Sequence, residues 1–172
     1  MNATPLSIEK INQLNQDEFV SIFSGIYEHS PWIPQEAFRA RPFRDLAHLA
    51  SSMQQTVLSS SYEAQLQLIR EHPELAGKAA IKKQLTDDSL REQSGAGLDN
   101  CSEEEFLLLN QLNRDYNAKF GFPFILAVKG YQRAGIIQNF SQRLNNDVSK
   151  EFQECIHQIG LIARFRLENL VT

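Results

Sequence analysis

The chain has 172 residues and a formal net charge of −4 at pH 7, with hydrophobic and charged fractions of 42% and 22%. These are ordinary values for a globular protein with one sizeable core, and the lack of a basic block argues against nucleic-acid binding. The two cysteines, Cys101 and Cys155, form no CxxC pair, so the sequence supports neither a zinc knuckle nor a redox motif.

The same sequence features predict a cytoplasmic protein. Two free thiols fit a reducing compartment. The first residues lack the basic and apolar regions of a secretory signal, and the last residues, "ENLVT", are not the peroxisomal "SKL" address. The longest apolar run, "FILAV", has about 5 residues, whereas a membrane-spanning helix needs about 20.

The first half of the chain predicts helices separated by short breaks. A capping box, Asn15 to Glu18, opens a helix that runs to about residue 27. "SPWIP" is a break, after which Pro34 suits the first position of a short helix. Helical spacing continues over residues 43–60 and 61–72, and the last of these helices ends before Pro73 because the residue preceding a proline avoids helical geometry.

The second half predicts four more helices and one extended segment. Thr86 is an expected N-cap, and Ser102 with Glu105 forms a second capping box for a helix that closes at Gly121. Helical patterns also cover residues 134–147 and 149–171, whereas residues 122–129 suit an extended connector. We therefore predict an all-α protein, a single domain over residues 1–172 with about eight helices.

The stretch "EHPELAGKAA" at residues 71–80 places an ionisable ring, His72, at the end of a helix. One interpretation is structural, because a protonated imidazole is favoured at a helix C-terminus. The other is acid–base chemistry. "HPE" matches half of a zinc deaminase signature, but the P-C-x-x-C half and any HExxH are absent, so we expect no metal.

Two other helical stretches carry polar groups on an apolar face. Ser89, Glu92 and Gln93 share a face with Leu85 and Ala96, which suits either a half-exposed stripe or buried groups with partners.

Arg166 lies within the apolar stripe of the last helix, whereas Arg164 falls off it. An inward guanidinium needs an anion, and both Glu92 and a bound carboxylate remain candidates. In "FGFPF" the rings suit core packing, and the extended backbone that follows could bind a ligand rich in amides.

Together these stretches resemble the 2-oxo-4-hydroxy-4-carboxy-5-ureidoimidazoline (OHCU) decarboxylase family of uric acid degradation, in its stand-alone form. The resemblance covers about residues 19–171 and is carried by "SPW", "ARPF", "HPELAGK", "LTDDSLREQSGAGLD", "LNRDYNAKFGFPFILAVKG" and "IARFRLENL". It implies an all-α homodimer that uses no cofactor or metal and converts a small anionic ureidoimidazoline to S-allantoin and CO2.

The resemblance also implies the roles of particular residues. His72 and Glu92 match the family's catalytic residues, and Arg166 matches its arginine. The implied substrate contacts are Pro73, Ser89, Leu90, Arg91, Glu92, Gln93, the backbone of Phe124, Ile125, Leu126, Ala127 and Val128, and Arg166. Two alternatives stay open: a non-catalytic ligand-binding module of the same fold, and an enzyme for a different small ureido or imidazoline acid.

Overall fold

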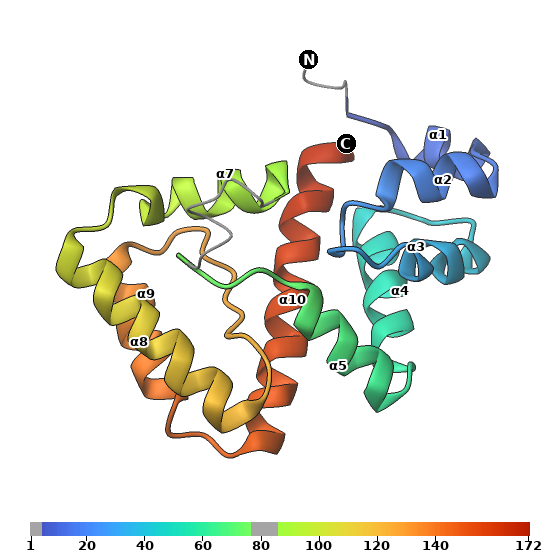
Figure 1. The fold of residues 1–172 in the computed structure, drawn as a ribbon. Coiled ribbons are helices and arrows are strands. Elements are labelled where there is room, and N and C mark those ends of the chain that lie inside the picture. Colours follow the sequence, from blue (N-terminus) through green and yellow to red (C-terminus); the bar gives the residue numbers. More distant parts are fainter. Residues whose placement is uncertain (1–4, 77–85) are drawn as a thin grey trace. The chain divides into compact units, whose positions relative to one another are not determined.

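The computed structural model describes residues 5–76 and 86–172, and its regular secondary structure is helical, which confirms the all-α prediction (Figure 1). Within these residues there are nine α-helices, against about eight predicted, and no strand, only an isolated bridge between Leu6 and Val171. The elements are α1 (Ile8–Gln13), α2 (Gln16–Phe23), α3 (Trp32–Ala37), η1 (Phe38–Ala40), α4 (Leu46–Leu58), α5 (Tyr62–Glu71), α7 (Asp87–Gly95), η2 (Leu98–Asn100), α8 (Glu103–Phe120), α9 (Arg133–Arg143) and α10 (Val148–Leu170).

Local capping sets most helix ends. Both predicted capping boxes are present, at the starts of α2 and α8, and the Thr86 hydroxyl caps α7 as predicted. Gly121 closes α8 with a φ of 75°, a left-handed conformation that glycine adopts without a steric penalty.

Several predicted helix ends are shifted. Helix α2 ends at Phe23 rather than at about residue 27, and α9 ends at Arg143 rather than at residue 147. Helix α3 begins at Trp32, so Pro34 is its third residue. A proline is tolerated there because the amide groups of the first helical turn have no partner within the helix. Helix α5 ends at Glu71, one residue before His72.

The contacts divide the protein into two compact units. Among the described residues, unit 1 comprises 5–71 and 160–172, and unit 2 comprises 72–76 and 86–159, so that α10 contributes to both. The prediction of a single domain stays a prediction. None of the described helices is long and apolar enough to cross a membrane.

Unit 1 packs its helices around a core of fully buried apolar side chains. Phe19 and Phe23, on α2, bring their ring centroids to 4.7 Å. Backbone hydrogen bonds join the two ends of the unit. The amide of Leu6 donates to the carbonyl of Leu170 at 2.8 Å, and the amide of Thr172 donates to the carbonyl of Leu6 at 3.0 Å. The other side chains of this core include Ile11, Ile33, Leu49, Met53, Val57, Leu68 and Ile69.

Unit 2 is built around aromatic rings. Tyr116 lies 5.4 Å from Phe124 and 5.7 Å from Phe140, measured between ring centroids, and the last two rings stack at 3.8 Å. Phe120 and Phe122 complete the cluster. The rings of "FGFPF" are therefore core residues, as predicted. Residues 123–128 have no regular secondary structure, which agrees with the predicted connector.

Candidate active site

His72 is the first residue after α5 and opens the turn that carries the candidate chemistry. Its side chain is buried, with 6% of the residue exposed, and the rigid ring of Pro73 follows it. A histidine buried at the start of a fixed turn is held in one place, which is what a proton donor aimed at one face of a substrate requires.

The turn after His72 is fastened by amide side chains from α7 and α8. Gln93 accepts the amide of Ala76 at 3.1 Å and donates to the carbonyl of Glu74 at 3.3 Å. Asn113 donates to the carbonyl of Leu75 at 2.9 Å, and Asn117 donates to the carboxylate of Glu74 at 2.6 Å. The sequence alone did not indicate this role for either asparagine.

These bonds hold a strained backbone. Ala76 has a φ of 50°, in the left-handed region that costs a non-glycine residue about 1 kcal/mol or more. The surrounding hydrogen bonds keep it there. The rest of the predicted "HPELAGK" motif, Gly77 and Lys78, lies outside the described residues.

Helix α7 carries the predicted "SLREQ" segment, and one face of the segment is buried while the other is exposed. Ser89 and Gln93 are buried, Leu90 and Glu92 are half-buried, and Arg91 is exposed. Arg91 donates to the carboxylate of Asp88 at 3.0 Å on the same helix. The buried stripe is therefore present at Ser89 and Gln93, while Leu85 lies outside the described residues.

A cavity of about 730 Å³ adjoins α7 and includes part of the predicted site. Among the described residues its lining includes Leu90, Arg91 and Gln93 of α7 together with Phe106 of α8, and it does not include His72, Glu92 or the connector. The cavity therefore borders three of the predicted substrate contacts without joining them to His72 or the connector.

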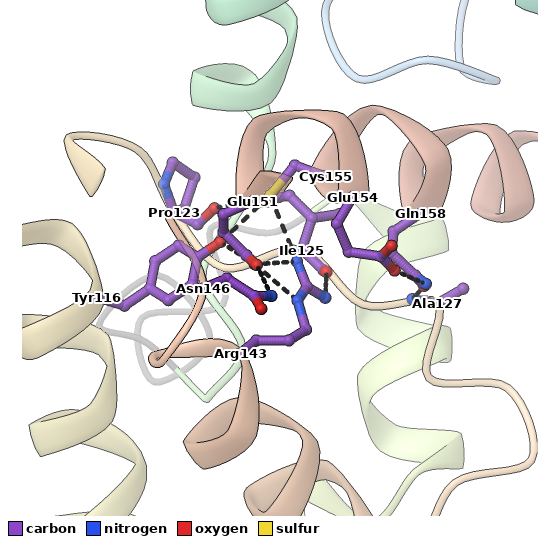
Figure 2. Close-up of polar contacts among 10 residues, drawn as sticks. All are labelled: Tyr116, Pro123, Ile125, Ala127, Arg143, Asn146, Glu151, Glu154, Cys155 and Gln158. Atoms are coloured by element: carbon purple, nitrogen blue, oxygen red, sulfur yellow. Dashed lines mark hydrogen bonds and ion pairs between the residues drawn. The ribbon is translucent and has the colours of Figure 1, made fainter. Parts of the chain in front are cut away.

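The connector from Phe124 to Val128 is buried at every residue, with 1–6% exposed. It lies against α9 and α10, from which polar side chains reach its backbone (Figure 2). The Arg143 guanidinium donates to the carbonyl of Ile125 at 2.6 Å and lies 4.3 Å from the centre of the Phe124 ring.

Arg143 belongs to a buried polar network that the sequence did not reveal. It pairs with Glu151 at 2.5 Å, and Glu151 also accepts hydrogen bonds from Tyr116 at 2.5 Å and from Asn146 at 2.8 Å (Figure 2). Burial raises the pKa of the Cys155 thiol, beside this pair, to about 11. Cys155 is therefore a neutral thiol at neutral pH and a poor nucleophile.

Arg166 lies in unit 1, where the predicted phase of the last helix is confirmed. Its side chain is 4% exposed, whereas that of Arg164 is 59% exposed and pairs with Glu168 at 3.3 Å. Arg166 donates to the buried carboxylate of Glu28 at 2.9 Å and to the carbonyl of Gly25 at 3.2 Å. Glu28, which precedes Arg166 by 138 residues, is the anionic partner that helical spacing did not identify.

Among the described residues no group of three or more histidines, cysteines and acidic residues is placed to hold a metal ion. The side chains near the turn and connector instead supply hydrogen-bond donors, acceptors and one imidazole. Such a set suits the positioning and protonation of an organic molecule.

Comparison with known proteins finds one family model, described as OHCU decarboxylase, that matches residues 12–168. Among relatives, 2-oxo-4-hydroxy-4-carboxy-5-ureidoimidazoline decarboxylases from Halalkalicoccus jeotgali and Haloferax volcanii are 37% and 38% identical. The first match covers 97% of this chain and 93% of the relative, and the second covers 94% of each. The uric acid degradation bifunctional protein PucL of Bacillus subtilis is 39% identical over 96% of this chain, which spans 33% of that protein.

Among the solved structures that share the fold is (S)-allantoin synthase, with a TM-score of 0.77 and 24% identity over 96% of this chain and 54% of that one. Another is OHCU decarboxylase crystallised in the presence of (S)-allantoin, with a TM-score of 0.70 and 18% identity over 91% of this chain and 98% of that one.

Proposed function

We propose a function from one premise: this chain belongs to the OHCU decarboxylase family, whose model matches residues 12–168. The proposed reaction is the decarboxylation of 2-oxo-4-hydroxy-4-carboxy-5-ureidoimidazoline to allantoin and CO2 in uric acid degradation. The match to full-length relatives of that name at 37% and 38% identity is the observation that carries it.

The structure of the substrate explains why the proposed reaction can proceed with amino-acid side chains alone. One ring carbon of the substrate bears both a carboxylate and a hydroxyl group, beside a carbon–nitrogen double bond. When CO2 leaves, its bonding electrons form a double bond to the neighbouring carbon, and the ring nitrogen takes up the displaced pair together with a proton from solvent. The hydroxyl then loses its proton to become a carbonyl, and the ureido-bearing carbon gains a proton. No external electron sink is needed.

Within this reaction His72 is the proposed proton donor to the ureido-bearing carbon. Its burial and its fixed place before Pro73 support that role. Glu92 is proposed to orient the imidazole or to bind the hydroxyl or ureido groups. Arg166 is proposed to hold a substrate oxygen, and its inward orientation supports this. Donation of the proton from one side would yield S-allantoin alone.

Two further proposals concern the state of the protein. The resemblance supports a homodimer, and so does apolar surface on α8, where Leu107 and Leu108 are 60% and 44% exposed. The free thiols of Cys101 and Cys155 support a reducing compartment, the cytoplasm.

The test is to supply freshly generated substrate and to follow both CO2 release and the circular dichroism of the allantoin formed. We expect accelerated release and a single enantiomer. Release at the uncatalysed rate, with binding of allantoin retained, would favour a ligand-binding module. Turnover of another ureido or imidazoline acid in preference to this substrate would favour an enzyme of different specificity.

A further inference from the structure

The side chains that hold the connector touch alternate residues of it. The carbonyl of Ile125 accepts from Arg143 at 2.6 Å, and the amide of Ala127 donates to the Gln158 side chain at 2.9 Å (Figure 2). The carbonyl of Pro123 and the amide of Ile125 both lie at the Cys155 sulfur. Contacts at residues 123, 125 and 127 follow the period of two that an extended backbone imposes.

The same period determines where the other peptide groups point. In an extended chain the amide and carbonyl of each residue face the side opposite to those of its neighbours. Phe124, Leu126 and Val128 therefore direct their amides away from Arg143 and Gln158.

Those amides are unused within the described part of the chain. There, none of the amides of Phe124, Leu126 and Val128 donates a hydrogen bond, although the three residues are only 1%, 3% and 5% exposed. Buried amides are almost always paired in native proteins, so three unpaired amides on alternate residues of a candidate site indicate a ligand that accepts hydrogen bonds.

The anchoring side chains are themselves fixed. Arg143 is held by Glu151, which also accepts from Tyr116, and the amide of Gln158 donates to Glu154 at 2.8 Å. The side chains of Arg143 and Gln158 are therefore each fixed by a second residue on α8 or α10. They have little freedom to rotate, so they hold the connector in one position.

We propose that Gln158 and Arg143 are positioning residues for substrate binding: by holding Ala127 and Ile125, they aim the amides of Phe124, Leu126 and Val128 at the carbonyl and carboxylate oxygens of the substrate. This inference rests on the proposed function for the identity of the ligand. A preset row of amide donors matches a ligand rich in such oxygens, and its alignment costs no reorganisation on binding.

Gln158 provides the sharper test, because removal of Arg143 would leave the Glu151 carboxylate buried without its cation and endanger folding. Gln158→Leu keeps similar bulk but removes the acceptor for Ala127. Gln153→Leu is the matched control, since Gln153 is exposed on the same helix.

We expect Gln158→Leu to raise KM about tenfold while kcat changes by less than about threefold, which is the pattern for lost binding common to ground state and transition state. Gln153→Leu should keep KM within about threefold of the parent enzyme. A Gln158→Leu enzyme with unchanged KM, or one whose loss tracks only a lower melting temperature, would overturn the positioning role.

A second measurement does not depend on turnover. Titration of the ¹⁵N-labelled protein with allantoin should shift the amide signals of Phe124, Leu126 and Val128 more than those of Ile125 and Ala127. Equal or reversed shifts would overturn the alternation. If the parent protein shows no turnover but the alternating shifts appear, the proposed function fails while the binding arrangement stands.

Discussion

Arg164 and Arg166 are two residues apart on α10 and meet opposite surroundings. Arg164 is exposed in a salt bridge with the residue four positions later, whereas Arg166 is buried against Glu28. An exposed pair of this kind contributes little because water and salt screen it, but a buried pair is costly to break since it leaves a carboxylate without its cation. The proposed substrate role of Arg166 therefore coexists with a structural one.

For this reason Arg166→Ala should lower the free energy of unfolding by about 3 kcal/mol or more, and Arg164→Ala by less than about 0.5 kcal/mol. Urea denaturation of the two variants provides the comparison. Where Arg166→Ala remains folded, its KM should also rise well above that of Arg164→Ala. Equal effects of the two substitutions on stability and KM would show that the phase of α10 is misassigned.

The variant His72→Asn distinguishes a catalytic role of His72 from a purely structural role in the turn. Asparagine is close in size and is tolerated at helix ends, so we expect a circular-dichroism spectrum like that of the parent protein. The rate should fall about 100-fold or more, the usual share of a positioned acid–base group. The allantoin formed should drift toward a racemate, because water would protonate either face. A folded variant that makes one enantiomer at the parent rate would remove His72 from the mechanism.

Among the elements, α9 and α10 hold the connector, and α7 and α8 hold the turn after His72. In both places side chains satisfy backbone groups that no sheet or helix pairs: Arg143 and Gln158 for the connector, Gln93 and Asn113 for the turn. Irregular backbone at a buried position requires such bonds, since an unpaired buried peptide group costs about 1–3 kcal/mol. The candidate site is thus irregular backbone supported by rigid helices.

We expect Arg143→Met to lower the free energy of unfolding by about 3–5 kcal/mol, because it leaves the fully buried Glu151 without its cation. Arg114→Met, on the exposed face of α8, is the control and should change stability by less than about 0.5 kcal/mol. The double substitution Arg143→Met with Glu151→Leu should recover much of the loss, since neither charge then remains. Thermal or urea unfolding measures all three, and an Arg143→Met protein as stable as the control would contradict a structural role for the pair.

At the scale of the whole molecule, a net charge of −4 gives no general attraction for an anionic substrate. The two buried arginines of the described chain, Arg143 and Arg166, are each paired with a buried carboxylate. Under the proposed function, local hydrogen-bond donors would have to hold the anion, and the amides of the connector are suited to that task because they carry no charge that needs compensation.

We expect turnover to survive exhaustive chelation, because the proposed reaction places its electrons in the substrate's own double bond. The assay compares enzyme dialysed against a strong chelator with untreated enzyme, and metal analysis of the dialysed sample is the control. Activity lost on chelation and restored by a single added metal would contradict this expectation.

The sequence by itself determined the features that depend on neighbours within a few turns of helix: the capping boxes at Asn15 and Ser102, the end of α8 at Gly121, and the inward phase of Arg166. Capping and helical phase are local, so a single chain segment carries them. Only the tertiary structure decided the partners of buried polar groups, such as Glu28 for Arg166 and Gln158 for Ala127. These pairs join residues 138 and 31 positions apart. A polar side chain on an apolar stripe predicts that a hydrogen-bonding or charged partner is present. Which residue is that partner depends on how the helices pack.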